Sequence, residues 1–296
     1  MNILIAGGTG FIGRYLSNIL IKNGHKVFVL TRNISQKNIN KNISLVDWQT
    51  INPELLKSVK VVIKLSGENV AQFWTKSAKE RILNSRVELT SELLKFCKNN
   101  EIIPDQLINA SAVGFYGRKD ALYNQTVDEN SEEGDSFLAE ICSKNEQSCE
   151  AFHVFDNIKV VQLRIGVVLT KKFTFLLALP TIFSLPNPGN KNYYFPWIHL
   201  DDVIGFINFS IENKLDGIFN IVGKDLTSHS VFYHTLAKNY FGFIPWTLFL
   251  PIFFIRCLGD MSEMLLYGPK TSSKKISNTG YTFKHENLKS ALKNLP

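Results

Sequence analysis

The sequence predicts an α/β protein in which a doubly wound parallel sheet is followed by a smaller C-terminal lobe. Three observations support this prediction. Strand-like and helix-like segments alternate through the first 169 of the 296 residues. A glycine-rich turn, GGTG, lies between the first strand-like run and the first helix-like run. After residue 169 the alternation gives way to a loop-rich stretch that contains Pro180, Pro186 and Pro188.

The predicted strands are short runs rich in Val, Ile and Leu. Continuous apolar runs of this kind are typical of strands that are buried on both faces of a parallel sheet. They lie at 2–7, 26–32, 43–48, 61–67, 106–113 and 159–169, with a last one at 217–223.

The predicted helices have apolar residues three and four positions apart, which places those residues on one face. They lie at 14–24, 54–59, 77–98, 137–152 and, after a strand end, at 197–213. Because strands and helices alternate, we expect the strands to run parallel and the helices to cover both faces of the sheet.

The segment FIPWTLFLPIFFIRCLG, at 243–259, is strongly apolar. It contains Pro245, Pro251 and Arg256, and its apolar run is shorter than the roughly 20 residues that span a membrane. We therefore expect a buried or pocket-lining segment, and no association with a membrane.

Composition narrows the range of partners. The net charge of +7 comes from Lys and Arg residues that are scattered along the chain, and no zinc-finger, helix-turn-helix or RNP-type motif accompanies them. We therefore expect a small-molecule ligand and no nucleic acid. The sequence leaves a homodimer possible.

Cysteine spacing gives no sign of a metal site. No CxxC pair occurs, and no histidine lies at zinc-ligand spacing from any of the four cysteines, Cys97, Cys142, Cys149 and Cys257. We therefore expect free thiols, a cytoplasmic location and no bound metal.

The glycine turn predicts a binding site for a dinucleotide. Gly7, Gly10 and Gly13 form G-x-x-G-x-x-G directly after the first strand and at the start of a helix. Glycine allows positive φ and a close approach of the backbone to a pyrophosphate. The start of the helix supplies free N–H groups and the positive end of the helix dipole. The alternative is a purely structural turn.

Arg32 indicates which nicotinamide cofactor is bound. An acidic residue at the end of the second strand pairs with the ribose hydroxyls of NAD, whereas an arginine suits the additional phosphate of NADP. The chain has LTRN at this place, with no acid beside Arg32. We therefore expect NADP(H), the alternative being an arginine that is simply on the surface.

These predictions divide the chain into two parts. Residues 1–169 form an NADP-binding Rossmann domain, to which residues 196–223 return. Residues 170–195 and 224–296 form the smaller C-terminal lobe, which we expect to bind the substrate over the end of the sheet.

Several segments resemble the extended short-chain dehydrogenase/reductases of the NAD-dependent epimerase/dehydratase superfamily, and within it the YfcH-like epimerase group. They include INASAVGFYG (108–117), LRIGVVL (163–169) and PWIHLDDV (196–203). WTKSAKERILNSRVELTSELL (74–94) and LGDMSEMLLYG (258–268) are also similar to this group. The resemblance runs from residue 1 to about 292, and the late segment resembles the group's C-terminal domain of unknown function.

The resemblance implies roles for residues along the cofactor. The pyrophosphate would be held by Gly7, Gly10, Phe11, Ile12 and Gly13. The 2′-phosphate would meet Arg32. The adenosine and ribose side would be lined by Leu65, Ser66 and Gly67, with Glu68 and Asn69 beside them, while Arg86 borders the cofactor and Ser111 faces the nicotinamide.

The resemblance also implies a pair of residues that this chain lacks. Redox enzymes of the superfamily use a Tyr and, four residues later on the same helix, a Lys that lowers the Tyr pKa. In FLAEICSKNEQ the usual positions fall near Leu138 and Cys142, and a shift of one residue gives Phe137 and Ile141. The usual machinery for proton transfer therefore cannot be carried over.

Ser111 and Tyr116 are the candidate catalytic residues that remain. Ser111 either orients a substrate oxygen or only positions a ligand. Tyr116 donates a proton if it points into the cleft; the alternative is a buried structural tyrosine. Further candidates, each with a structural alternative, are Glu140, Arg164, Trp74, Trp197 and His199. Arg164, for example, either clamps an anionic substrate or pairs with a carboxylate such as Asp202.

The chain also departs from the YfcH-like group near the expected substrate pocket. The residues before Trp74 are typically basic in that group, whereas Gln72 and Phe73 stand there in this chain. The loop 170–195 lacks the glycine-rich run that is usual in the group. If the basic residues grip an acidic substrate, this chain holds it more weakly, and the second departure indicates a substrate pocket of a different shape.

Two functions are compatible with the sequence. The first is an NADP(H)-binding, epimerase-like oxidoreductase that acts on a small polar substrate. The alternative is a catalytically silent NADP(H)-binding regulatory or sensor protein. The missing Tyr and Lys favour the second, and the glycine turn is compatible with both.

Overall fold

The computed structural model describes residues 1–35, 40–117, 125–178, 193–242 and 268–296. Within these residues, seven parallel strands form a central sheet in the order β3-β2-β1-β4-β5-β6-β9. Their bounds are β1 (Asn2–Ala6), β2 (Lys26–Thr31), β3 (Ile43–Asp47), β4 (Val59–Lys64), β5 (Gln106–Ala112), β6 (Lys159–Ile165) and β9 (Gly217–Ile221). This order confirms the predicted doubly wound Rossmann-type fold: β2 and β3 are added on one side of β1, and the strands from β4 onward on the other.

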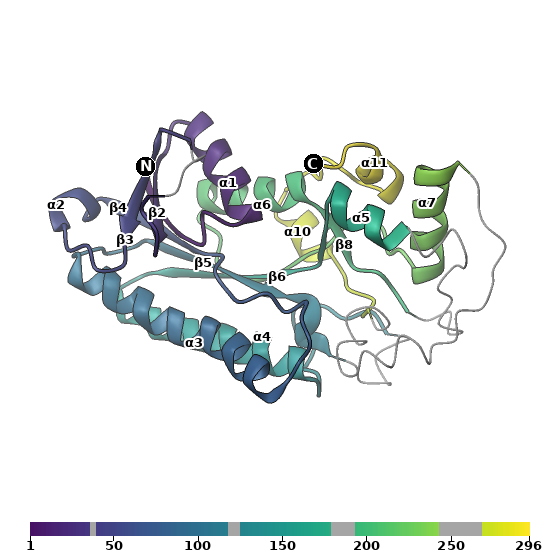
Figure 1. Cartoon of the computed structure of the whole chain (residues 1–296), viewed down its shortest axis with the longest axis horizontal. Coiled ribbons are helices and arrows are strands. Elements are labelled where there is room, and N and C mark those ends of the chain that lie inside the picture. The colour runs from purple at the N-terminus through teal and green to yellow at the C-terminus, as the bar shows by residue number, and fades with distance from the viewer. Residues whose placement is uncertain (36–39, 118–124, 179–192, 243–267) are drawn as a thin grey trace.

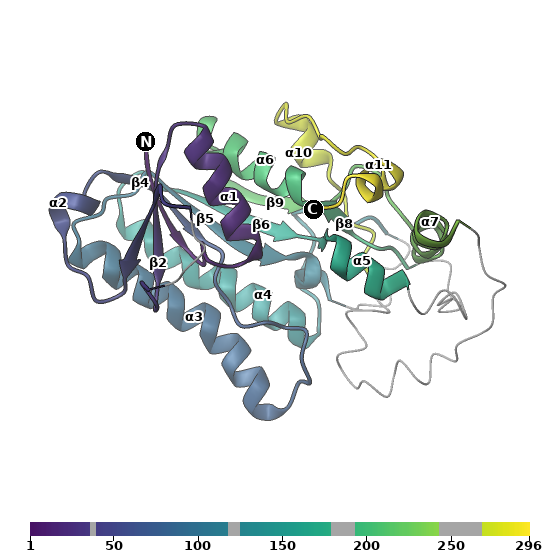
Figure 2. The same ribbon diagram turned by 45° about the horizontal axis from the view of Figure 1, so that its top comes forward.

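Helices cover both faces of the sheet. Their bounds are α1 (Phe11–Lys22), α2 (Pro53–Leu56), α3 (Lys76–Asn99), α4 (Phe137–Ser148) and α6 (Leu200–Glu212), with 3₁₀ turns η1 (Val113–Tyr116) and η3 (Cys149–Val154). Figures 1 and 2 show α1 and α6 side by side on one face, and α3 and α4 side by side on the other.

Two apolar clusters, one on each face, hold these layers together. The first joins the sheet to α1 and α6 through side chains such as Leu16, Leu20 and Ile207. The second joins the sheet to α3 and η3 through side chains such as Leu93 and Phe152. Burial on both faces explains why the strands are continuous apolar runs without alternation.

The run predicted as one strand at 159–169 is in fact two strands. β6 ends at Ile165, and β7 (Val167–Leu169) leaves the sheet to pair with β8 (Trp197–His199). Gly166 lies at the break, where its N–H donates to the carbonyl of Ile221 at the end of β9. The change of direction carries the chain out over the carboxyl ends of the strands.

The remaining described elements gather at this end of the sheet. They are α5 (Lys171–Ala178), α7 (His229–Phe241), α10 (Lys274–Asn278) and α11 (Leu288–Lys293). Figure 1 shows α5, α7 and α11 beyond the ends of β6 and β8. A third apolar cluster, which includes Phe195 and Trp197, packs α5, α7 and α11 together, whereas Ile276 of α10 packs into the first cluster. The apolar segment 243–259 lies outside the described residues, and among those described no helix has the length and hydropathy needed to cross a membrane.

Candidate functional site

The glycine turn after β1 is tightly packed against itself and against the strand beside it. Gly7 has φ of +91°, a conformation that disfavours any side chain. A Cβ on Gly7 would lie 2.7 Å from the backbone nitrogen of Ser66, and one on Gly13 would lie 2.3 Å from the carbonyl oxygen of Gly7. The sequence therefore folds into this turn only with glycine at these two positions.

The start of α1 is open to a ligand. Gly10 is the N-cap residue, and it supplies no side chain to satisfy the first N–H groups of the helix. An uncapped helix start that follows a glycine turn is a binding site for phosphate groups, because N–H groups and the helix dipole favour negative charge there. The pyrophosphate of a dinucleotide fits this cradle.

A cleft of about 800 Å³ extends from the turn toward the ends of β2 and β4. Of the residues predicted to bind the cofactor, those that line it are Gly7, Gly10, Arg32, Leu65, Ser66, Gly67 and Glu68. Arg32 is exposed at the end of β2, and it forms no ion pair with any residue that the structure describes. Its guanidinium is therefore available to an anionic group in this cleft.

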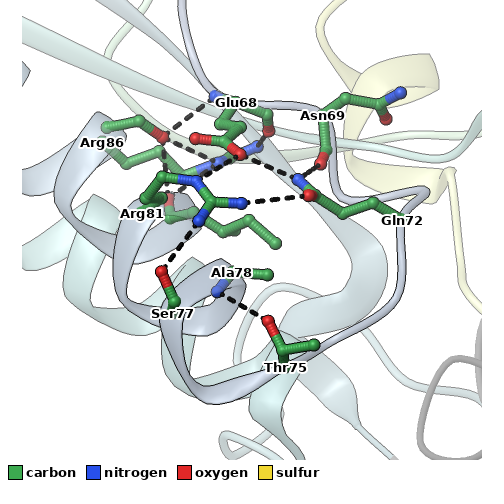
Figure 3. A network of polar contacts seen from close by, with 10 residues as sticks. Glu68, Asn69, Gln72, Thr75, Ser77, Ala78, Arg81 and Arg86 are labelled. Atoms are coloured by element: carbon green, nitrogen blue, oxygen red, sulfur yellow. Dashed lines mark hydrogen bonds and ion pairs between the residues drawn. The ribbon is translucent and has the colours of Figure 1, made fainter.

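Glu68 does not offer a free carboxylate to the cleft. Its Oε1 accepts hydrogen bonds from Gln72 Nε2 at 2.9 Å and from Arg81 Nε at 3.1 Å, as Figure 3 shows. The bond from Gln72 and the charge and hydrogen bond of Arg81 lower the pKa of this carboxyl. Gln72, which departs from the YfcH-like pattern, thus helps to hold the loop that follows β4.

Arg86 closes this region from α3. Its guanidinium donates to the carbonyls of Ile82 at 3.0 Å and Glu68 at 3.1 Å. A Cβ on Gly67 would lie 2.8 Å from the guanidinium carbon, so a side chain at that position would displace the Arg86 guanidinium. Arg86 lines the second part of the cleft, described next.

The second part of the cleft has a volume of about 420 Å³ and meets the first part at Leu65, Ser66 and Gly67. We call it the inner pocket. It runs past Ile12 and Ser111 to the residues around Phe195 and Pro269. Its described lining is mostly apolar and includes Val70, Ala110, Val113, Leu138, Ile141, Ile165, Val167, Val168, Phe195, Pro196 and Pro269.

Leu138 and Cys142 of α4 both line the inner pocket, where the sequence alignment of the usual Tyr and Lys places them. The Leu138 side chain is apolar. Burial raises the pKa of the Cys142 thiol to about 11. Neither residue therefore provides a phenolate or an ammonium at this point of the pocket.

Ser111 lies at the end of β5 and lines the inner pocket. Its hydroxyl donates to Glu146 Oε1 at 2.6 Å, and the same carboxylate receives two hydrogen bonds, of 2.9 and 3.0 Å, from Arg164. The buried ion pair thus fixes the direction of the Ser111 proton. A ligand would meet the lone pairs of this hydroxyl, which accept hydrogen bonds.

The structure corrects the expectation for Tyr116. Its side chain is fully buried, and its hydroxyl donates to Asn220 Oδ1 at 2.6 Å and accepts from Arg164 at 3.1 Å. Burial raises its pKa to about 12. Tyr116 lines neither part of the cleft, and its role is the structural alternative that the sequence left open.

Arg164 likewise has a structural position. It pairs with Glu146 and not with Asp202, and its guanidinium lies 3.4 Å from the centre of the Phe115 ring. Asp202 instead accepts hydrogen bonds from the backbone N–H groups of Lys284 and His285. The anion clamp considered for Arg164 is therefore not the arrangement found.

The remaining candidates lie away from both parts of the cleft. Trp197 is buried, with its indole N–H on Thr227, and Trp74 packs edge-on against Phe137. Glu140 forms an exposed ion pair with Lys144.

His199 belongs to a hydrogen-bonded cluster at the start of α6. With Asp201 and His285 it is the group among the described residues whose ligand atoms lie close enough together for a metal ion. However, both His199 nitrogens are engaged, Nδ1 by the N–H of Asp201 and Nε2 by the carbonyl of Asn294. The cluster therefore ties α6 to the C-terminal residues.

Phe11 and Gly13 were expected to hold the cofactor but do not line the cleft. Phe11 is exposed and packs against Tyr15, and Gly13 is buried under the turn. Ile12, between them, lines the inner pocket and not the part of the cleft beside the glycine turn.

Two polar residues of this region were not predicted from the sequence. His229, the first residue of α7, lines the inner pocket, and Lys64, at the end of β4, is buried beside it. Lys64 donates to Thr90 and to Asn145, which also lines the pocket. A lysine within an apolar strand was the available signal for the second residue, whereas nothing in the sequence distinguishes His229 from other histidines.

Comparison with known sequences agrees with this geometry. Residues 3–222 match the NAD dependent epimerase/dehydratase family, and residues 250–295 match a domain of unknown function, DUF1731. The chain is 32% identical over 306 residues to epimerase family protein YfhF of Bacillus subtilis, covering 100% of this chain and 98% of the relative. It is also 32% identical to epimerase family protein SSP1921 of Staphylococcus saprophyticus, covering 99% and 98%.

Solved structures give the same result. The crystal structure of human epimerase family protein SDR39U1 with NADPH has a TM-score of 0.82 and 27% identity, covering 99% of this chain and 98% of that one. UDP-glucuronic acid 4-epimerase from Bacillus cereus, in complex with UDP-glucuronic acid and NAD, has a TM-score of 0.75 at 22% identity, covering 99% and 97%. The second likeness shows the fold alone. The protein therefore belongs to the NAD dependent epimerase/dehydratase family, as an NAD(P)-binding member whose C-terminal residues match DUF1731.

Proposed function

We propose that the protein binds NADP(H) in preference to NAD(H) and is an oxidoreductase for a small substrate held in the inner pocket. The observation that carries this proposal is Arg32 at the end of β2, exposed and without an ion-pair partner among the described residues, where the cleft would receive the adenosine ribose. The NADPH in the similar human SDR39U1 structure supports the same cofactor.

The residues present fit the cofactor along its length. The uncapped start of α1 would bind the pyrophosphate, Arg32 the 2′-phosphate, and the loop of Leu65 to Gly67 the ribose groups. The nicotinamide would then lie in the inner pocket beside Ser111. When bound, the cofactor supplies or accepts a hydride at its nicotinamide ring.

Ser111 is the residue that we propose contacts the reacting end of a ligand. Since its proton is directed to Glu146, it accepts a hydrogen bond and so recognises a donor, such as an alcohol or a carboxamide N–H. The sequence predicted a small polar substrate. The mostly apolar lining now favours a substrate with a polar group on an apolar body.

The cofactor preference is tested by titrating the protein with NADPH and NADH and following the fluorescence of the nicotinamide. We expect NADPH to bind more tightly by about tenfold to a hundredfold, because a hydrogen bond between charged groups contributes about 1.5–3 kcal/mol. Arg32→Ala should remove most of this preference and leave NADH affinity nearly unchanged.

Lys22→Ala is the matched control for this titration. It removes one exposed positive charge from the last turn of α1, away from the cleft. It should leave the preference intact. Equal affinities of the parent protein for NADPH and NADH would contradict the assignment.

A specific observation favours the second function, a catalytically silent NADP(H)-binding protein. Leu138 and Cys142 present no group for proton transfer to the inner pocket. The two functions differ in turnover, which is measured as loss of NADPH absorbance with a panel of small aldehydes and ketones. Tight NADPH binding without turnover of any compound would favour the silent function.

A further inference from the structure

The end of the inner pocket around Phe195 and Pro269 is formed by residues that follow residue 169 in the chain. The backbone N–H of Phe195 bonds to Thr227, and the backbone N–H of Tyr194 bonds to Gly268, so three distant segments meet here. The ring of Phe195 stacks on Phe232 of α7 at 3.7 Å. The start of α7 is thereby held against the pocket.

His229 is the first residue of α7 and lines this end of the pocket. Its side chain is 4% exposed, and its backbone N–H donates to the carbonyl of Tyr193 at 3.0 Å. The ring lies edge-on to Phe195 and Tyr233, with centroids 5.6 and 6.1 Å apart. The imidazole is therefore fixed in place by the surrounding aromatic rings.

The protonation of His229 follows from this environment. Burial lowers its pKa to about 4, although a hydrogen bond to the backbone of Tyr194 acts in the opposite direction. The ring is therefore neutral near pH 7. A neutral imidazole that donates one N–H to a backbone carbonyl has its second nitrogen as a hydrogen-bond acceptor.

The charges around the pocket restrict what can bind beside His229. Arg86 is the charged side chain in the described lining, and its guanidinium already donates to the carbonyls of Ile82 and Glu68. The described lining at this end of the pocket also includes Phe195, Pro196 and Pro269, which carry no charge. A diphosphate group would lose its hydration here without gaining a positively charged partner among these residues.

We propose that His229 binds the substrate by accepting a hydrogen bond from a hydroxyl group, and that the substrate is an uncharged, mainly apolar alcohol. This assignment rests on the proposed function, since it takes the nicotinamide to lie between Ser111 and His229. A sugar nucleotide does not fit the chemistry of the described lining.

The experiment uses two probes of nearly equal shape, benzyl alcohol and ethylbenzene. Benzyl alcohol carries a hydroxyl group where ethylbenzene carries a methyl group. Each is titrated into the NADPH-saturated protein and followed by NMR. His229→Leu should weaken benzyl alcohol binding by about threefold to tenfold, the range expected for one hydrogen bond, and should not weaken ethylbenzene binding. His229→Gln retains an acceptor and should keep most of the affinity for benzyl alcohol.

Two controls separate this result from general damage to the pocket. His234→Leu changes a histidine on the same helix that bonds to Ser230 and does not line the pocket, so it should leave both affinities unchanged. UDP-glucose should not displace benzyl alcohol from the parent protein.

Equal losses for both probes in His229→Leu, an unchanged affinity for benzyl alcohol, or displacement by UDP-glucose would each overturn the assignment. NADPH affinity is measured first for every variant. Failure of the parent protein to bind NADPH would refute the proposed function and this inference with it, whereas normal NADPH binding with any of the three outcomes refutes the inference alone.

Discussion

Lys64 and Ser111 lie beside the inner pocket, and their hydrogen bonds determine how each can act. Ser111 directs its proton to Glu146, so it is fixed as an acceptor toward a ligand. Lys64 is 1% exposed, and its ammonium donates to the neutral oxygens of Thr90 and Asn145. Among the described residues, Lys64 has no carboxylate partner. Burying a charged group without such a partner costs free energy.

The buried Lys64 predicts an unusual dependence of stability on pH. Burial, together with the charge of Arg86, lowers its pKa from 10.5 to about 8, while Cys149 acts in the opposite direction. Because the folded pKa is below the unfolded one, the protonated lysine opposes folding at pH below about 8. As pH rises from about 8 to 10.5 the folded protein loses this proton before the unfolded chain does, so stability is gained.

This pH dependence is measured by urea unfolding of the parent protein and Lys64→Met between pH 7 and 10.5. Relative to the variant, the free energy of unfolding of the parent should rise by about 2–4 kcal/mol across this range. The comparison cancels the titration of other lysines and tyrosines. A constant difference between the two proteins would show that Lys64 does not titrate in this range.

At the level of whole elements, the site depends on where strands end. The apolar run 159–169 predicts one strand, but the chain turns at Gly166 and β7 pairs outside the sheet. The cause is a contact with Pro196, which lies thirty residues further along the chain. The apolar pattern of a single segment carries no information about such a distant contact. The resemblance was more informative for α4, because the superfamily's Tyr and Lys positions, one helical turn apart, pointed to Leu138 and Cys142, and both line the inner pocket.

Gly166→Ala tests the role of this strand break. A Cβ there would lie 2.1 Å from the carbonyl oxygen of Pro196 and 3.0 Å from the Val222 side chain, so the backbone of Pro196 would have to shift. We expect the free energy of unfolding to fall by about 1–3 kcal/mol, the usual cost of overpacking, and NADPH affinity to fall as well.

Lys172→Ala, an exposed substitution on α5, is the control for Gly166→Ala and should change neither quantity. Thermal or urea unfolding gives the stability, and nicotinamide fluorescence gives the affinity. A variant as stable as the parent protein would show that the break does not require glycine.

For the molecule as a whole, the sequence was sufficient to predict the fold and the cofactor end of the cleft. Those features depend on local signals: apolar runs, the spacing of Gly7, Gly10 and Gly13, and the place of Arg32 after the second strand. The direction of Tyr116 was not predictable, because the turn η1 carries its side chain into the core toward Asn220. His229 was missed because only tertiary contacts bring α7 to the pocket.

We propose that one continuous cleft holds NADP(H), from Arg32 at one end to the inner pocket at the other. A crystal structure of the NADPH complex tests it most directly. We expect the 2′-phosphate against Arg32, the pyrophosphate at the start of α1, and the nicotinamide beside Ser111 with Leu138 and Cys142 facing it. A cofactor bound with its 2′-phosphate away from Arg32, or with its nicotinamide outside the inner pocket, would contradict the account.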